Sequence, residues 1–256
     1  MNLHFRALGS GPPLVILHGL LGSLDNWVPV AHKLGHHFQI FLVDLRNHGH
    51  SPHAEEFGYD EMAEDLREFL NQQHLAKAHI LGHSMGGKVA MRFAQLHPGM
   101  LGKLVVVDIA PRKYPSRYSG LMDAMLAVNL SGLQRRDEVD VALSSTIPDT
   151  AFRQFLLKNL GRDASGQLFW KPNLKSIRAN YDAVRGNFPG DTRCDCPALF
   201  IRGEKSNYIQ ENDLTLIHEL FPAAQIETIA GAGHWVHANA PDKVVDVATR
   251  FLLAES

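Results

Sequence analysis

The chain has 256 residues, 45% of them hydrophobic, which is long enough to bury a full core within one α/β domain. Acidic and basic residues are interspersed and give a formal net charge of -2, which argues against a nucleic-acid partner. The amino terminus lacks the basic and apolar regions of a secretory signal, and no stretch approaches ~18 apolar residues, so we expect a cytoplasmic protein without a membrane span.

Short apolar runs and helical segments alternate along the chain. The N-terminal segment 3–8 is expected to supply one or two antiparallel edge strands. The apolar runs lie at 14–17, 40–43, 79–81, 104–107, 198–201 and 226–229. The helical patterns lie at 25–34, 60–74, 88–96, 213–221 and 241–253. Continuous apolar runs are typical of parallel strands covered on both faces, so the alternation predicts an α/β fold with a mostly parallel central sheet flanked by helices.

This alternation is interrupted between residues 112 and 193, where the sequence shows only helical segments, around 120–130, 136–145 and 151–160. An interval of roughly eighty residues is too long for a loop. We therefore predict a core domain from residues 1–111 and 194–256, with 112–193 inserted as a helical cap over the carboxyl ends of the strands. Eight apolar residues of the cap are candidates either to line an acyl pocket or to pack the cap onto the core: Leu121, Met122, Met125, Phe152, Phe155, Leu156, Phe169 and Trp170.

A serine between small residues follows the third apolar run, in the string GHSMGG at 82–87. The pattern G-x-S-x-G is typical of a nucleophile elbow, a strained turn from strand to helix that exposes the serine hydroxyl. Gly82 and Gly86 would keep Cβ atoms out of this crowded bend. The pattern makes Ser84 the candidate nucleophile.

A serine hydroxyl is a poor nucleophile near neutral pH unless a histidine can accept its proton. His234 lies in a glycine-rich turn after the last predicted strand, where it is the candidate general base, and we interpret His237 as a structural or supporting residue. Two backbone N–H groups are needed for an oxyanion hole, and the candidates are those of Met85, after the nucleophile, and Leu20, in the loop after the first strand. We interpret His18 in that loop as a bracing residue.

Taken together, these motifs make the sequence resemble the α/β-hydrolase superfamily over its full length. The segments that carry the resemblance are 17–19, 44–51, the serine string at 82–87 and 231–234. Within the superfamily it resembles the bacterial YbfF-type esterases and their mitochondrial relatives, in the strings GLLGSLDN at 19–26, RNHG at 46–49, GHSMGGK at 82–88 and VDIAP at 107–111. The cap matches much less.

The acid departs from the commonest pattern of the superfamily, which places it in a Gly-x-x-Asp string after the strand at 198–201. Here that string places Ser206 at the usual acid position, and a hydroxyl cannot stabilise an imidazolium as a carboxylate does. Asp108, at the end of the strand after the elbow, is the candidate acid. Glu204, and an arrangement based on Ser206 or water, remain alternatives, and Ser206 is also a candidate supporting residue. We interpret Asp44 as a structural anchor for the turn at 46–51.

The resemblance implies a serine esterase that acts on small-molecule carboxylic esters, with acyl-CoA thioesters as a further substrate class and with no cofactor. Carbon–carbon bond hydrolases, lactonases and perhydrolases use the same kind of triad, and a ligand receptor with a slow triad is an alternative of another class. Cys194 and Cys196 are too close in sequence to suit a structural disulfide or a zinc site, and the fifteen histidines show no metal-binding spacing. We therefore expect no metal.

Overall fold

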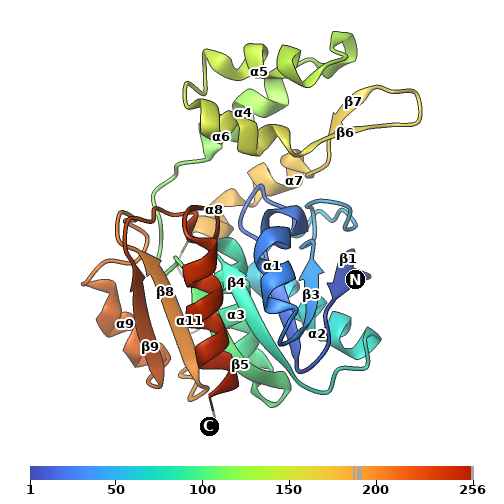
Figure 1. Ribbon diagram of the computed structural model, residues 1–256. Coiled ribbons are helices and arrows are strands. Elements are labelled where there is room, and N and C mark those ends of the chain that lie inside the picture. Colours follow the sequence, from blue (N-terminus) through green and yellow to red (C-terminus); the bar gives the residue numbers. More distant parts are fainter. Residues whose placement is uncertain (187, 189–191, 255–256) are drawn as a thin grey trace.

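A seven-stranded sheet forms the centre of the molecule in the computed structural model, which describes residues 1–186, 188 and 192–254 (Figure 1). The strand order is β1-β3-β2-β4-β5-β8-β9, and every neighbouring pair is parallel except β1 with β3. The predicted mostly parallel sheet is therefore confirmed, with a single antiparallel edge strand. The strands are β1 (Phe5–Leu8), β2 (Pro13–Leu17), β3 (Gln39–Val43), β4 (Ala78–His83), β5 (Leu101–Val107), β8 (Ala198–Gly203) and β9 (Ala224–Ile229).

Helices cover both faces of this sheet, as the continuous apolar strands require (Figure 1). Along β2, Leu14 and Ile16 join the buried cluster that contains α1 and α11, whereas Val15 and Leu17 join the cluster that contains α2, α3 and α9. The core helices are α1 (Val28–Leu34), α2 (Tyr59–Gln72), α3 (Met85–Leu96), α9 (Asp213–Leu220), α10 (Val236–Asn239) and α11 (Pro241–Leu253). Short 3-10 turns are η1 (Leu24–Trp27), η2 (Pro98–Met100) and η3 (Leu130–Gly132).

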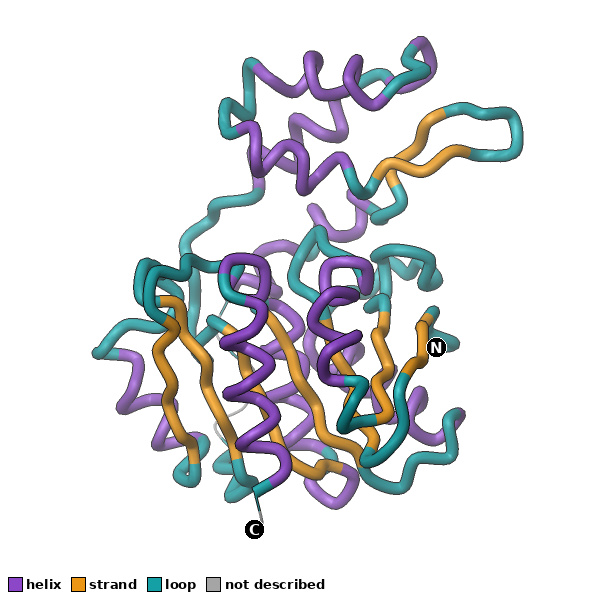
Figure 2. The backbone as a smooth tube through the Cα atoms, in the orientation of Figure 1, coloured by secondary structure: helices purple, strands orange, loops and turns teal. Residues whose placement is uncertain are grey.

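The remaining elements form a second layer beyond the carboxyl ends of the strands, above the sheet in Figures 1 and 2. They are α4 (Ser119–Ala127), α5 (Arg136–Ser144), α6 (Thr150–Leu157), β6 (Leu160–Arg162), β7 (Leu168–Trp170), α7 (Leu174–Ala179) and α8 (Tyr181–Arg185). We call this set, residues 119–185, the upper layer. Its position over the strand ends places it where ligands bind in open α/β sheets.

One expectation about local structure was wrong and another is refined. The interval 112–193 is not purely helical, because β6 and β7 form an antiparallel hairpin, and strands of three residues are too short to show a periodic pattern. The helical pattern expected at 25–34 is present, but its first turn is the 3-10 turn η1 and the α-helix starts at Val28, next to Pro29. A proline suits the first turn of a helix because its missing N–H would have no partner there.

Some apolar residues of the upper layer pack in the core, and others line a cavity. Met122, Met125 and Leu156 are buried in the core, whereas Phe169 is 42% exposed. Phe152 and Phe155 line a cavity beside Ser84. No helix in the described ranges combines the length and the apolar composition that crossing a bilayer requires.

Candidate active site

Ser84 lies at the sharp turn between β4 and α3, with φ 52° and ψ -118°. A Cβ atom on Gly82 would overlap the carbonyl of Gly86, and one on Gly86 would lie 2.5 Å from the carbonyl oxygen of His18. Only glycine fits at either position because the obstructing atoms are backbone. The Ser84 N–H donates to the carbonyl of Val107 at 3.0 Å, which ties the turn to the end of β5. The strained turn leaves Ser84 partly exposed at the carboxyl edge of the sheet.

Three widely separated side chains meet at this edge. His234 Nε2 lies 3.1 Å from Ser84 Oγ, and His234 Nδ1 lies 2.8 Å from Asp108 Oδ2. Asp108 is fully buried and follows the last residue of β5 with φ 53°. Its carboxylate accepts further hydrogen bonds from the Gly203 N–H at 3.0 Å and from the Ser206 hydroxyl. An acid held by several donors and bonded to Nδ1 can fix the imidazole with Nε2 facing the serine.

The alternative acid, Glu204, points elsewhere. Its carboxylate accepts a hydrogen bond from the Gly231 N–H at 2.8 Å, at the start of the turn that carries His234, and the residue is exposed. Ser206, at the position where the superfamily usually has the acid, donates to Asp108 and accepts from the Tyr208 N–H at 3.2 Å. Glu204 thus holds the loop, whereas Ser206 contacts the carboxylate itself.

The N–H groups of Leu20 and Met85 donate no hydrogen bond to another of the described residues. Met85 is the first residue of α3, so its N–H has no partner within the helix. Leu20 and Met85 both line a cavity next to Ser84. Backbone donors without another described partner, in a cavity next to a serine, can stabilise an oxyanion.

The Leu20 loop is braced from the core and from the upper layer. His48 Nε2 accepts from the Leu21 N–H at 3.1 Å, and His18 Nε2 accepts from the Leu45 N–H at 3.0 Å. Asn159, which follows α6, donates to the carbonyl of Leu21 at 2.6 Å while 3% exposed. Leu21, the residue next to Leu20, is thus held by the core through its N–H and by the upper layer through its carbonyl. Nothing in the sequence pattern around Asn159 indicated this contact.

Asp44 anchors the neighbouring turn, as the sequence predicted. Its carboxylate accepts from the Leu24 N–H at 2.8 Å and the His50 N–H at 2.9 Å. The two contacts join the loop after β2 to the turn after β3. The loop therefore keeps its shape through buried hydrogen bonds, which is what a preorganised donor requires.

Burial keeps the histidines around the site neutral. It lowers the pKa of His18 to about 4 and those of His48 and His237 to about 3, because the charged imidazolium is disfavoured away from water. The same cause lowers the pKa of His83 well below its usual value. His237 stacks on Trp27 at a ring distance of 4.3 Å, consistent with the structural role expected for it.

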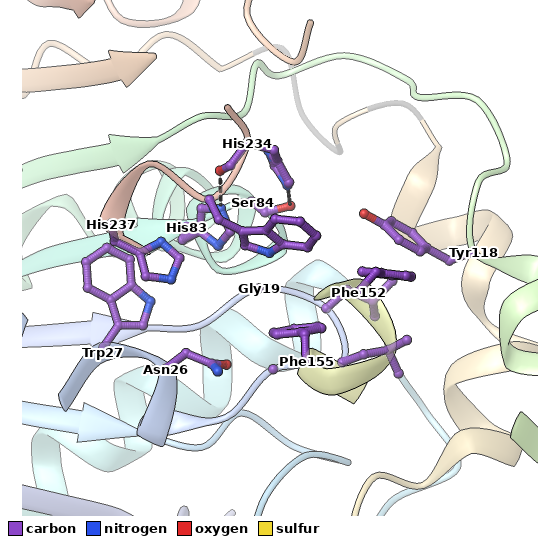
Figure 3. A pocket seen from close by; sticks show the side chains of 14 residues that line it. Gly19, Asn26, Trp27, His83, Ser84, Tyr118, Phe152, Phe155, His234 and His237 are labelled. Carbon is purple, nitrogen blue, oxygen red and sulfur yellow. Dashed lines mark hydrogen bonds between the residues drawn. The ribbon is translucent and has the colours of Figure 1, made fainter. Parts of the chain in front are cut away.

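Tyr208 packs on the imidazole of His234 and His83 contacts the backbone of the same residue, and no sequence pattern indicated either role. The ring of Tyr208 stacks on that of His234 at 3.6 Å with an interplanar angle of 14°. His83 Nε2 lies 3.0 Å from the His234 carbonyl oxygen, a contact drawn in Figure 3 beside the one between His234 and Ser84. The ring is thereby fixed by stacking as well as by the carboxylate.

Two cavities meet at Ser84. The first lies between the core and α6, with Phe152, Phe155 and Tyr118 facing His234 and Ser84 across it (Figure 3). The second extends from Ser84 past Met85 and Lys88 toward α8. Among the described residues, no group of three or more histidine, cysteine or acidic side chains could hold a metal ion.

Comparison with known proteins gives a consistent set of relatives. The model of the α/β hydrolase fold family matches residues 12–241. The chain is 38% identical to the sn-1-specific diacylglycerol lipase ABHD11 of Danio rerio, over 97% of this chain and 80% of that protein. It is 38% identical to esterase YbfF of Escherichia coli, over 98% of this chain and 99% of that protein. A solved structure of a marine microorganism esterase superposes with a TM-score of 0.94 at 44% identity, covering 97% of this chain and 98% of that chain.

Proposed function

The chain belongs to the α/β-hydrolase fold family, and from this premise we propose that it is a serine hydrolase that cleaves carboxylic esters through an acyl-enzyme intermediate. Ser84 is the nucleophile, His234 the general base and acid, and Asp108 the carboxylate that orients His234. The observation that carries the proposal is the unbroken chain of hydrogen bonds from Ser84 Oγ through both ring nitrogens of His234 to Asp108.

In the first half of the reaction Ser84 Oγ attacks the carbonyl carbon of the ester while His234 Nε2 accepts the hydroxyl proton. The carbonyl oxygen becomes an oxyanion, and the N–H groups of Leu20 and Met85 stabilise it. Collapse of this intermediate breaks the bond to the leaving group, which takes the proton from His234 and departs as an alcohol. The acyl group remains bound to Ser84 as an ester.

In the second half a water molecule takes the place of the alcohol. His234 accepts a proton from the water as the water attacks the acyl carbon, and then returns that proton to Ser84 Oγ. Asp108 stabilises the imidazolium formed in each half, and Ser206 supports Asp108 by donating to the same oxygen that faces the ring. The same geometry can attack a thioester carbonyl, so acyl thioesters belong to the proposed substrate class.

Steady hydrolysis of p-nitrophenyl butyrate tests the proposal. Ser84→Ala should lower kcat by a factor of about 10⁴ or more, because triad residues act as a unit. Ser10→Ala, which removes an exposed hydroxyl far from the site, is the matched control and should leave the rate unchanged. Retention of the activity by Ser84→Ala would refute the proposal. A receptor with a slow triad would instead release one equivalent of p-nitrophenol and stop.

A further inference from the structure

The two cavities beside Ser84 share only Leu20, Ser84 and Tyr118 among the described residues that line them, so the site has two arms. The first arm is lined by His234, Trp235 and two phenylalanines of α6, Phe152 and Phe155. It continues into a surface groove between α6 and α10, since Asn26, Phe155, Trp235 and His237 line both spaces. The second arm runs the other way, from Met85 along α3 to α8.

On the proposed function, each arm receives a different part of the substrate. The leaving oxygen must come within hydrogen-bond reach of His234 Nε2 to receive its proton, so the leaving group occupies the arm that His234 lines. The acyl carbon is bonded to Ser84 on the side away from that oxygen. The acyl chain therefore extends into the second arm, which Met85 lines and His234 does not.

Lys88 is the unusual residue of the second arm. It lies one helical turn after Ser84 on α3 and is only 1% exposed. Its ammonium donates to the carbonyls of Arg112 at 2.7 Å and Gly186 at 3.2 Å, and lies 5.5 Å and 5.2 Å from the ring centres of Tyr59 and Tyr114. No described carboxylate pairs with it. An ammonium has three protons, so one donor remains for a ligand.

Every charged residue that lines the second arm is a cation: Lys88, Arg117 and Arg185. Arg185 pairs with the exposed Asp182. Arg117 is exposed, and its guanidinium lies 3.4 Å from the amide oxygen of the neutral Asn207 and 5.6 Å from the ring centre of Tyr208, with no described carboxylate paired to it. The Tyr181 hydroxyl accepts from the N–H groups of Arg117 and Tyr118, which leaves its own proton free to be donated. The arm thus offers positive charge and spare donors but no acidic group from the described residues.

We propose that the second arm takes acyl groups that end in a carboxylate, so that the substrates are half-esters or half-thioesters of dicarboxylic acids, with Lys88 as the residue that selects the carboxylate. A buried cation without a counter-ion is costly, and burial lowers the pKa of Lys88 to about 7. A carboxylate on the acyl chain supplies the missing counter-ion and restores the charged ammonium. The apolar remainder of the arm, with Ile109 and Val184, accommodates the methylene groups between the two carboxyl carbons.

The test compares monoethyl glutarate with ethyl pentanoate, in which a methyl group replaces the carboxylate, by measuring ethanol release at pH 7. The readout is the ratio of the two kcat/KM values. In the wild-type protein we expect the half-ester to be favoured about tenfold or more, and Lys88→Met should lower this ratio by about tenfold, the size of one charge-assisted hydrogen bond. Lys175→Met removes an exposed lysine that lines neither arm and should not change the ratio.

Because Lys88 is buried, Lys88→Met can fail to fold, so a second variant is made at the exposed Arg117. Arg117→Gln should lower the same ratio about threefold. A wild-type preference for ethyl pentanoate, or a ratio that neither variant changes, would overturn the inference. Ser84→Ala separates this failure from that of the proposed function. If Ser84→Ala abolishes hydrolysis of both esters while the wild-type protein hydrolyses the two with nearly equal kcat/KM, the proposed function stands and only the assignment of the second arm is wrong.

Discussion

Replacing Asp108 by asparagine tests the assignment that departs most from the usual superfamily pattern. The carboxylate accepts three hydrogen bonds, from the Gly203 N–H, the Ser206 hydroxyl and His234 Nδ1. An amide has one oxygen and one NH₂ group, so in either orientation it turns a donor toward the Gly203 N–H or toward His234 Nδ1. With the NH₂ group toward His234, the ring would keep its proton on Nε2, which then cannot accept the proton of Ser84.

The expected loss of kcat in Asp108→Asn follows from the wrong tautomer of His234. A wrong tautomer in a serine–histidine–acid triad lowers kcat about 10⁴-fold. Because each factor of ten corresponds to about 1.36 kcal/mol, the loss of transition-state stabilisation is roughly 5 kcal/mol. Initial rates of p-nitrophenyl butyrate hydrolysis at pH 7.5 measure it, and near-UV circular dichroism verifies that Asp108→Asn keeps its native packing.

Glu204→Gln is the matched control for this substitution. Glu204 is exposed, and the only described partner of its carboxylate is the Gly231 N–H, from which an amide oxygen can also accept a hydrogen bond. Its kcat should therefore stay within about threefold of the wild-type value. If Glu204→Gln proves the more damaging change, or if Asp108→Asn keeps more than about a tenth of the activity, Asp108 does not orient His234.

Two further predictions concern the surroundings of the triad. Ser206→Ala removes one donor to the carboxylate oxygen that faces His234 and should lower kcat about tenfold, as measured with the same ester, whereas an unchanged rate would make Ser206 dispensable. The free energy of unfolding should fall with pH below about 6.5, because His18 and His48, with pKa values of about 4 and 3, stay neutral in the folded chain while the unfolded chain binds protons. At pH 5 this costs about 2 kcal/mol for each of the two histidines, and urea denaturation that gave equal stability at pH 7.5 and pH 5 would contradict it.

The sheet could be predicted from the sequence because its strands are continuous apolar runs, and each such run appears in the structure as a strand of the parallel part. The serine turn could be found because only glycine fits at positions 82 and 86. The hairpin of β6 and β7 could not, because its stability comes from its place in the upper layer and not from a local pattern. Asn159 and Tyr208 were missed for a similar reason, since each acts on a loop far away in sequence.

The register of the sheet explains why the carboxylate can come from the end of β5. Val107 pairs with Ile201 on the adjacent parallel strand β8, so the residues that follow both strands emerge side by side at the same edge. Asp108 follows the first strand, and Ser206 lies in the loop after the second. Both side chains consequently reach the same place beside His234, and their hydrogen bond joins the usual acid position to the one used here.

Fifteen histidines occur in the chain, and the structure gives a physical reason why His234 is suited to act as the base. Among the described histidines, His234 is the one that places one ring nitrogen within hydrogen-bond reach of Ser84 Oγ and the other against a carboxylate. His18 and His48 use a ring nitrogen to accept a backbone N–H, and burial lowers their pKa values together with those of His83 and His237. Neighbours that stay neutral add no charge to repel the imidazolium that forms on His234. The buried histidines around the site thus favour proton transfer at one ring, where Asp108 stabilises the charge.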